Sequence, residues 1–318
     1  MSRSPWVVQE GFPAMADFEP LFRDGPAAAA LGRKLEYHRL VASTNDLATK
    51  AARAGAAHGH LVLAEEQSAG RGRRGRAWLA PPGRALLLSL VVRGPALRAG
   101  RLGWLALGVG LAAVEAIRRG GAVAARVKWP NDVVVVGGAD IPVCRAGGGQ
   151  AGMPVPPRPA WRKLGGVLVE SAVAGRNGPL DYAIAGVGLN VLQTADELPE
   201  CDKAPATSVR LEAAGRVSRP ELLAELLPRL DARVAWVTEA GSSSRGFEAL
   251  RAEVRARLDE WWGGWRFEAR APEGTCAGLF AGLDDHGRLR LKTASGRETV
   301  LADAELVGGT PEESAAST

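Results

Sequence analysis

The chain is poor in cysteine and in long apolar runs, and each scarcity argues against a class of protein. Three cysteines lie far apart in 318 residues, at Cys144, Cys201 and Cys276. An odd number of widely spaced cysteines argues against a secreted disulfide scaffold and against a Cys-X-X-Cys metal or redox site. The longest apolar stretch, Leu102 to Ile117, is interrupted by Glu115 and falls short of the ~20 residues that span a membrane. It therefore predicts a buried core helix. No apolar signal segment opens the chain, which favours a cytoplasmic protein.

Lysine is scarce as well, whereas arginine is abundant. The chain has 40 basic and 35 acidic residues, and only six of the basic ones are lysines. A basic balance of this kind is typical of nucleic-acid binding, but it also arises from the arginine bias of a GC-rich genome. The position of the charge along the chain must decide between the two.

Local patterns predict two folded parts. Residues 1–33 contain four prolines and predict an irregular extension. Over residues 34–262, helix-like segments alternate with short apolar runs, and residues 137–161 form a Gly/Pro-rich insertion. One helix is expected to begin at Ser218-Arg219-Pro220-Glu221, which has the pattern of a capping box and precedes a leucine stripe of helical spacing. Residues 263–310 hold short strand-like runs between turns, which predict a small all-β barrel.

The densest charge lies in Gly70-Arg71-Gly72-Arg73-Arg74-Gly75-Arg76, here called the arginine loop. Guanidinium groups bind phosphate and carboxylate through two parallel hydrogen bonds, and glycine lets the backbone approach a ligand. Removing the four arginines would lower the formal net charge from +5 to +1, so most of the basic excess lies here. The segment alone fits a phosphate-binding loop, an RGG-like nucleic-acid loop or a solvated basic loop.

Three further segments place polar groups at the ends of predicted strands. Lys128-Trp129-Pro130-Asn131-Asp132 offers a carboxylate for Mg²⁺ and an amide for phosphate or ribose, or it is a simple hairpin turn. Lys163 stands at the start of an apolar strand, as a point charge for a ligand or as an edge lysine that discourages aggregation. Gly186 and Gly188 lie inside a strand that ends at Asn190, where glycine is costly unless a ligand or backbone passes close.

The histidines and nucleophiles predict little chemistry. His38, His58, His60 and His286 are expected on the surface, without a metal site. No Gly-X-Ser-X-Gly or Ser-His-Asp signature is present, so a covalent hydrolase mechanism is not expected.

The order of these segments resembles the catalytic domain of biotin–protein ligases (biotin–[acetyl-CoA-carboxylase] ligases). The resemblance covers roughly residues 35–307 and rests on Ser43-Thr44-Asn45, Gln67 with the arginine loop, Lys128 to Asp132, Lys163 to Glu170, Gly186 to Asn190 and Thr207 to Leu211. It implies an α+β fold, with a mixed β-sheet catalytic domain of the class II synthetase-like, biotin/lipoate ligase type followed by a small SH3-like β-barrel. The repressor-type members have a DNA-binding N-terminal domain that is not recognised here, so a monofunctional form is expected.

The resemblance also implies a role for each matching residue. Biotin binding falls to Ser43, Thr44, Asn45, Gln67, Arg71, Gly72, Arg73 and Lys163, ATP binding to Arg74, Arg76, Asn131 and Asn190, catalysis to Lys163 and Arg73, and Mg²⁺ binding to Asp132. The 137–161 insertion departs from the family, which joins the strands bearing Asp132 and Lys163 by a short turn.

The implied reaction has two steps. Biotin and MgATP give biotinyl-5′-AMP and pyrophosphate, and the biotinyl group then passes to a lysine of a biotin carboxyl carrier protein. ATP, Mg²⁺ and biotin are expected as substrates, with no tightly bound cofactor. The expected partner is the carrier protein; a homodimer is compatible with the resemblance, and neither nucleic acid nor a membrane is expected. Two alternatives stay open: a lipoate–protein ligase, and a nucleic-acid-binding protein that uses the arginine loop.

Overall fold

The computed structural model describes residues 6–8, 18, 21, 35–137, 161–172, 180–199, 204–238 and 245–312. The predicted insertion lies outside these residues except at its two ends, Gly137 and Trp161.

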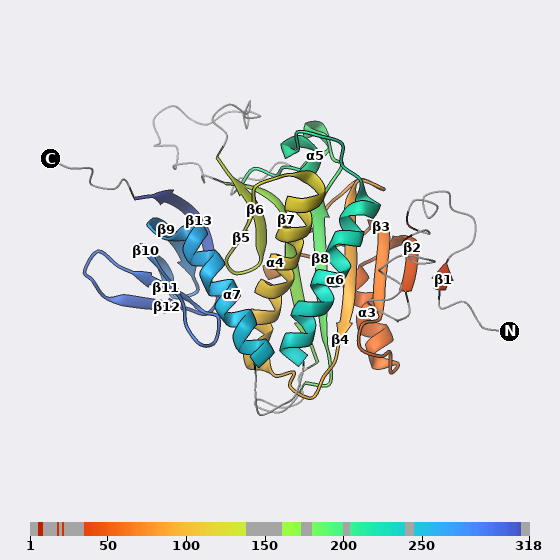
Figure 1. The fold of residues 1–318 in the computed structure, drawn as a ribbon, viewed down its shortest axis with the longest axis horizontal. Coiled ribbons are helices and arrows are strands. Elements are labelled where there is room, and N and C mark those ends of the chain that lie inside the picture. Colours follow the sequence, from red (N-terminus) through yellow and green to blue (C-terminus); the bar gives the residue numbers. More distant parts are fainter. Residues whose placement is uncertain are drawn as a thin grey trace.

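The larger part is built on one mixed sheet of eight strands in the order β1-β2-β3-β4-β8-β7-β6-β5 (Figure 1). The strands are β1 (Trp6–Val8), β2 (Leu35–Val41), β3 (Leu61–Gln67), β4 (Ala85–Val92), β5 (Ala125–Lys128), β6 (Asp132–Val136), β7 (Trp161–Ser171) and β8 (Ala183–Asn190). The first three strands of this order pair in parallel, and the other neighbours pair antiparallel. The predicted α+β fold with a mixed sheet is confirmed.

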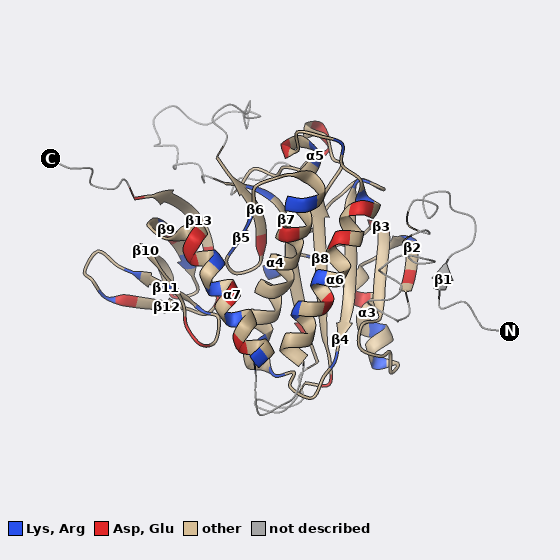
Figure 2. Ribbon diagram, viewed as in Figure 1, with Lys and Arg blue, Asp and Glu red and all other residues tan. Residues whose placement is uncertain are grey.

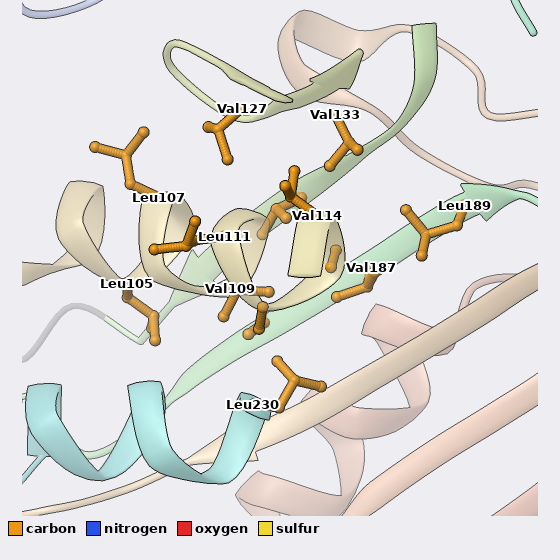
Figure 3. Packing of buried hydrophobic residues seen from close by; sticks show 14 of the residues in the cluster. Leu105, Leu107, Val109, Leu111, Val114, Val127, Val133, Val187, Leu189 and Leu230 are labelled. Carbon is orange, nitrogen blue, oxygen red and sulfur yellow. The ribbon is translucent and has the colours of Figure 1, made fainter. Parts of the chain in front are cut away.

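Helices cover both faces of this sheet. On one face, α4 (Leu102–Gly121) and α6 (Arg219–Thr238) share one hydrophobic core with the strands, and α7 (Arg245–Trp262) joins them (Figures 1 and 3). On the other face, α3 (Thr44–Arg53) packs Ala48 and Ala52 into a smaller cluster. A fifth helix, α5 (Val209–Glu212), is a single turn. Charges of both signs are interspersed along the outer sides of α6 and α7, as expected for helix faces in water (Figure 2).

Strand β4 explains why one serine interrupts an apolar run. Because side chains alternate between the two faces of a strand, Leu86, Leu88 and Leu90 belong to the core beneath α4, whereas Val91 belongs to the cluster beneath α3. Ser89 shares the face of Val91 and is fully buried under the start of α3. This one polar position in the strand therefore points to a polar site at that helix end.

Two helices that the sequence predicts are confirmed. The Leu102–Ile117 run lies in α4, and the segment Ala99–Gly121 is long and apolar enough to cross a membrane, but most of it is buried inside the molecule as a core helix. Helix α6 begins after Ser218, whose Oγ accepts a hydrogen bond from the Glu221 backbone N–H at 3.3 Å. Its leucine stripe is fully buried.

The C-terminal residues form a five-stranded antiparallel sheet in the order β12-β11-β10-β9-β13. Its strands are β9 (Trp265–Ala271), β10 (Gly274–Leu283), β11 (Leu289–Lys292), β12 (Glu298–Leu301) and β13 (Glu305–Pro311). The architecture changes at Gly263 and Gly264, between α7 and β9, where the sequence places a domain boundary. The two parts share one apolar core, in which Trp262 of α7 and Phe267 of β9 lie 5.5 Å apart between ring centroids.

Two expectations of the sequence differ from the fold. Residues 1–33 are not wholly irregular, because Trp6–Val8 adds a short parallel strand to β2 and Phe18 is buried with its ring 6.2 Å from that of Tyr37. Strand β13 was not expected, because Gly308 and Gly309 weaken its strand pattern. A Cβ at Gly309 would lie 2.6 Å from the Phe267 ring, so glycine is required there for the strand to pack.

Candidate functional site

One cavity of about 220 Å³ opens at the N-terminus of α3, between the arginine loop, the turn from β5 to β6, strands β7 and β8, and the C-terminal segment 304–306. All thirteen residues that the sequence assigns to the site line it: Ser43, Thr44, Asn45, Gln67, Arg71, Gly72, Arg73, Arg74, Arg76, Asn131, Asp132, Lys163 and Asn190. Segments from much of the chain therefore meet in one place.

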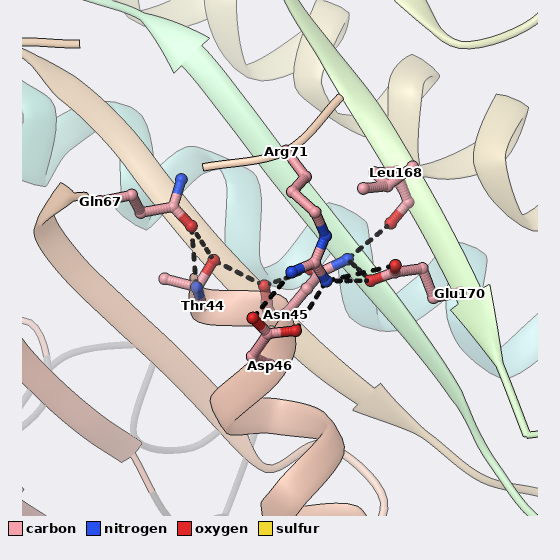
Figure 4. A network of polar contacts seen from close by, with 8 residues as sticks. Thr44, Asn45, Asp46, Gln67, Arg71, Leu168 and Glu170 are labelled. Atoms are coloured by element: carbon pink, nitrogen blue, oxygen red, sulfur yellow. Dashed lines mark hydrogen bonds and ion pairs between the residues drawn. The ribbon is translucent and has the colours of Figure 1, made fainter. Parts of the chain in front are cut away.

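The N-terminus of α3 forms a polar corner of the cavity (Figure 4). Thr44 donates to Gln67 Oε1 through its backbone N–H at 2.8 Å and through its hydroxyl at 3.0 Å. Ser89 of β4 stands within hydrogen-bond distance of Thr44 Oγ1 (2.8 Å) and Asn45 Oδ1 (2.6 Å). These bonds orient the side-chain amides of Asn45 and Gln67. Because Oε1 of Gln67 accepts from Thr44, its Nε2 remains available as a donor. Exposed backbone N–H groups at a helix N-terminus favour an acceptor or anion there.

Arg71 and Asn45 are held by two acids that sequence reasoning did not include in the site. Arg71 pairs with both oxygens of Asp46 at 2.7 Å and lies 3.3 Å from Glu170 Oε1 (Figure 4). The Arg71 hydrogen bonds hold the pKa of Asp46 below its ordinary value, although partial burial opposes the shift. Asn45 Nδ2 donates to Glu170 Oε2 at 2.6 Å. Asp46 directly follows Ser-Thr-Asn and Glu170 ends the strand begun near Lys163, so sequence proximity was the available signal.

The two glycines of β8 are needed by neighbouring side chains of the cavity. A Cβ at Gly186 would overlap the Asn45 side-chain amide, and one at Gly188 would lie 2.8 Å from the Trp78 ring. Both close groups are side chains, whereas the sequence predicts a ligand or backbone there; the ligand stays a prediction. Trp78, which sequence reasoning also missed, lines the cavity, and its buried Nε1 finds no hydrogen-bond partner among the residues that the structure describes.

A charge triad with buried Lys128 and half-buried Asp132 and Lys163 lies on the opposite wall. Asp132 accepts from Lys163 Nζ at 2.6 Å through Oδ1 and pairs with Lys128 Nζ at 3.0 Å through Oδ2. Burial disfavours the ionised carboxylate, but the two ammonium groups outweigh it and hold the pKa of Asp132 well below its usual range. Lys163 Nζ also lies 6.0 Å from the centroid of Trp78. Two cations around one carboxylate leave a net positive charge facing the cavity.

The triad bears on the expected Mg²⁺ site. Each oxygen of Asp132 already contacts an ammonium group, which leaves no oxygen of this carboxylate free of a cation. Within the described part of the chain, no group of three or more His, Cys, Asp or Glu side chains is arranged to hold a metal ion. Asp132 as a direct Mg²⁺ ligand stays a prediction, and this geometry favours a role in holding the two lysines.

The arginine loop is a tight hairpin. Arg71 and Ala77 form an antiparallel bridge, and Arg74 and Gly75 at the tip both have positive φ, 57° and 72°. This pair of positive values is typical of the type I′ turn that favours glycine. Arg73 Nη1 donates to Asn131 Oδ1 at 3.2 Å, and Asn131 Nδ2 donates to Val167 O at 2.7 Å. Burial lowers the pKa of Arg73 from its ordinary value, and nearby Asp303 opposes that shift. The hairpin thus places one desolvated guanidinium over the cavity.

Asn190 lines the cavity with both ends of its amide engaged. Its Nδ2 donates to Thr207 O and its Oδ1 accepts from Gln193 Nε2, each at 3.0 Å. The next segment is fixed by Ser208, whose Oγ accepts from Leu211 N–H at 3.2 Å and caps α5. The ATP-binding role of Asn190 stays a prediction. The contacts of Asn190 show that it ties β8 to the loop before α5.

One expectation about the histidines is wrong. His60 is buried, with Nε2 3.3 Å from Glu36, because it precedes β3 and lies beside β2 rather than on the surface. His286 is exposed, as expected.

Comparisons with known proteins find relatives of this chain. The family model of the biotin/lipoate A/B protein ligase family matches residues 37–190. The chain is 31% identical over 295 residues to a biotin–[acetyl-CoA-carboxylase] ligase of Mycobacterium tuberculosis, covering 91% of this chain and 94% of the relative. It is 34% identical over 272 residues to a ligase of the same name from Paracoccus denitrificans, and the match covers 84% of this chain and 98% of the relative.

The fold has solved relatives as well. The structure of the biotin protein ligase from Aquifex aeolicus in complex with biotin and ATP superposes with a TM-score of 0.62. The identity is 24%, and the match covers 86% of this chain and 97% of the other. At this identity the likeness concerns the fold.

Proposed function

The chain belongs to the biotin–protein ligase family, and we propose that it is an ATP-dependent biotin–[acetyl-CoA-carboxylase] ligase that forms biotinyl-5′-AMP and transfers the biotinyl group to a carrier lysine. The observation that carries the proposal is the shared cavity, in which a polar corner and a cluster of cations lie within one enclosure.

The polar corner suits the ureido end of biotin. A urea has one carbonyl acceptor and two N–H donors, so it needs donors and acceptors held side by side. Thr44, Asn45 and Gln67 provide both kinds of group, with their orientations fixed by Ser89 and Glu170. Arg71 stands at the rim of this corner, held by Asp46. We assign biotin recognition to these residues and to Ser43, which lines the same cavity.

The cations suit the chemical step. The biotin carboxylate attacks the α-phosphorus of ATP, the bond to the β-phosphate oxygen breaks, and pyrophosphate leaves with the electron pair. Negative charge then develops on phosphate oxygens, where preorganised cations are usually the largest catalytic contribution. Lys163 and Arg73 are assigned to this task, because the first is fixed by Asp132 and the second by Asn131. Arg74 and Arg76 are assigned to the phosphates of ATP.

Mg²⁺ enters the reaction with ATP, as part of the substrate MgATP. Magnesium is usually held by one or two carboxylates together with substrate phosphates and water. The phosphates of ATP would supply most of its ligands in this cavity, since both oxygens of Asp132 face lysines.

In the second step the carrier lysine amine attacks the acyl carbon of biotinyl-5′-AMP and AMP leaves. The acceptor would be a biotin carboxyl carrier protein, reached through the open side of the cavity. A homodimer and a cytoplasmic location remain predictions of the sequence.

The test is pyrophosphate release from ATP in the presence of biotin, followed by transfer to a carrier domain of the same proteome. Biotin is expected to support both steps, and Lys163→Ala to lose most of the activity while keeping the far-UV circular dichroism of the wild type. Pyrophosphate release with lipoate but not with biotin would replace the proposal with a lipoate–protein ligase.

The nucleic-acid alternative predicts binding that weakens steeply with salt. The arginines of the loop instead face a cavity and pair with acidic side chains of the same chain. Tight binding of DNA or RNA together with unchanged biotin activation in Arg73→Ala would favour the alternative.

A further inference from the structure

The arginine loop is held by acidic residues of the C-terminal sheet. Arg73 Nη2 donates to Asp303 Oδ1 at 2.7 Å, and Arg74 Nη2 lies 3.1 Å from the same oxygen. Arg76 Nη2 lies 2.6 Å from Glu305 Oε2. Three of the four loop arginines therefore pair with one short segment between β12 and the start of β13.

Apolar packing does not fix the loop on this side. None of the residues 71–77 is buried, so the loop has no hydrophobic anchor of its own. Arg74 moreover holds a left-handed backbone conformation, which is unfavourable for a residue other than glycine. Its guanidinium makes a second contact with this segment, a hydrogen bond to the Asp303 backbone carbonyl at 3.2 Å. Among the described residues, these ion pairs and the hydrogen bonds of Arg73 to Asn131 and of Arg74 to the Asp303 carbonyl therefore oppose release of the hairpin tip.

We propose that Asp303 and Glu305 are positioning residues that hold the arginine loop over the cavity, so that the C-terminal sheet is a working part of the site. The inference rests on the proposed function. Ala304, Glu305 and Leu306 themselves line the cavity beside the loop, so the acidic segment and the loop close the same side of it.

The acids hold the arginines without neutralising them. Three guanidinium groups share two carboxylates, which leaves one positive charge for phosphate. Each guanidinium has five N–H donors, and Arg73 uses one nitrogen for Asp303 and another for Asn131. Asp303 is the main anchor because it contacts two arginines, whereas Glu305 contacts one.

Tryptic cleavage of the folded full-length protein within the arginine loop, located by mass spectrometry, tests the inference without substrate. Asp303→Asn is expected to raise the cleavage rate about threefold to tenfold, since exposed ion pairs are individually weak and two are lost. Asp303→Glu should restore much of the protection. The matched control is Glu298→Ala, which removes an acid of similar exposure that pairs with Arg290 of the same sheet.

Kinetics supply the second measurement. In Asp303→Asn the KM for MgATP should rise about as much as the cleavage rate, and kcat should fall because Arg73 is held less firmly at the phosphates. The thermal midpoint should change little. Wild-type cleavage and wild-type KM in the double variant Asp303→Asn/Glu305→Gln would overturn the inference. Failure of the wild type to use biotin would refute the proposed function instead, and the cleavage comparison would still report on the loop.

Discussion

At the scale of single residues, Asp132 controls the charge of one cavity wall. Its carboxylate is shared by Lys128 and Lys163, so it holds two cations close together in a partly buried place where they would otherwise repel each other. The arrangement fixes the Lys163 ammonium group before a substrate arrives, while two of its three N–H donors remain for other acceptors.

Replacing Asp132 by Asn should therefore destabilise the protein. Removing one partner of a fully buried ion pair costs about 3–5 kcal/mol, because the remaining charge stays buried without compensation. Asp132 and Lys163 keep 17% and 30% of their side-chain surface exposed, so the loss of unfolding free energy should be smaller than this but well above that of an exposed ion pair. The measurement is the free energy of unfolding by urea at pH 7, with Glu298→Ala as an exposed acid that should change it little. An equal effect of the two substitutions would contradict the argument.

The difference in unfolding free energy between the wild type and Asp132→Asn should depend on pH. The folded pKa of Asp132 lies below its unfolded value of 3.8, so the carboxylate stabilises the fold above pH 3.8. That contribution is lost as the pH falls from 3.8 toward the folded pKa. The difference in unfolding free energy between the wild type and Asp132→Asn should stay constant from neutral pH to about 5 and narrow below about 4.

Gly186→Ala tests the close approach of Asn45. The added methyl group would overlap the Asn45 amide and displace it from Ser89 and Glu170. Overpacking of this kind lowers the free energy of unfolding by about 1–3 kcal/mol. Because the Asn45 amide is displaced from its place in the polar corner, the KM for biotin should rise roughly tenfold or more. The KM for ATP should change much less. Gly215→Ala, with no heavy atom within 4 Å of the added Cβ, is the control. Equal effects on both KM values would argue against a biotin-specific corner.

At the scale of elements, the sequence predicts the helices and strands that depend on local pattern. The apolar run of α4, the Ser218 cap of α6 and the short strands β9 to β12 each depend on neighbouring residues, and they form as expected. Strand β13 was missed because its stability comes from pairing with β9 rather than from its own Gly-rich pattern.

The site residues also divide into those that local sequence indicates and those that only the fold brings together. Residues carried by contiguous motifs were found, because the motif itself signals a turn or a strand end. Ser89 and Asp303 were missed because each acts on a residue far away in the chain, and only the folded sheet brings the partners together. Trp78 stands two residues beyond the arginine loop, yet nothing in its neighbours indicates that it faces Gly188.

The tip of the arginine loop offers a test of the hairpin as an element. Gly75→Ala forces a side chain into a positive φ of 72°, and Gly55→Ala does the same at 90° beyond the end of α3. No heavy atom lies within 4 Å of either added Cβ, so both should lose about 1 kcal/mol of stability through backbone strain alone. Only Gly75→Ala should also raise the KM for MgATP, by several-fold. A similar rise in Gly55→Ala would show that general destabilisation is the cause.

At the scale of the whole molecule, the two sheets are joined by an aromatic cluster. Trp161 at the start of β7, Trp262 at the end of α7, and Trp265 and Phe267 of β9 lie with ring centroids between 5.0 and 6.2 Å apart. Trp262 Nε1 also donates to Val127 O at 2.8 Å, next to Lys128 of the charge triad. The C-terminal sheet thus continues the core that supports the cavity, and the position of the segment 303–306 depends on that core.

This continuity predicts that the chain unfolds as one unit despite the predicted boundary at residue 263. Phe267→Ala should cost about 3–5 kcal/mol, because a buried aromatic ring is removed from the junction. Tryptophan fluorescence, far-UV circular dichroism and residual biotin activation should then all report one transition in guanidinium chloride, shifted together to lower concentration. Val300→Ala, at a half-exposed position of β12, should leave the midpoint nearly unchanged. If Phe267→Ala instead separates an early loss of activity from a later unfolding of the main sheet, the C-terminal sheet is an independent domain, and its hold on the arginine loop must come from the ion pairs alone.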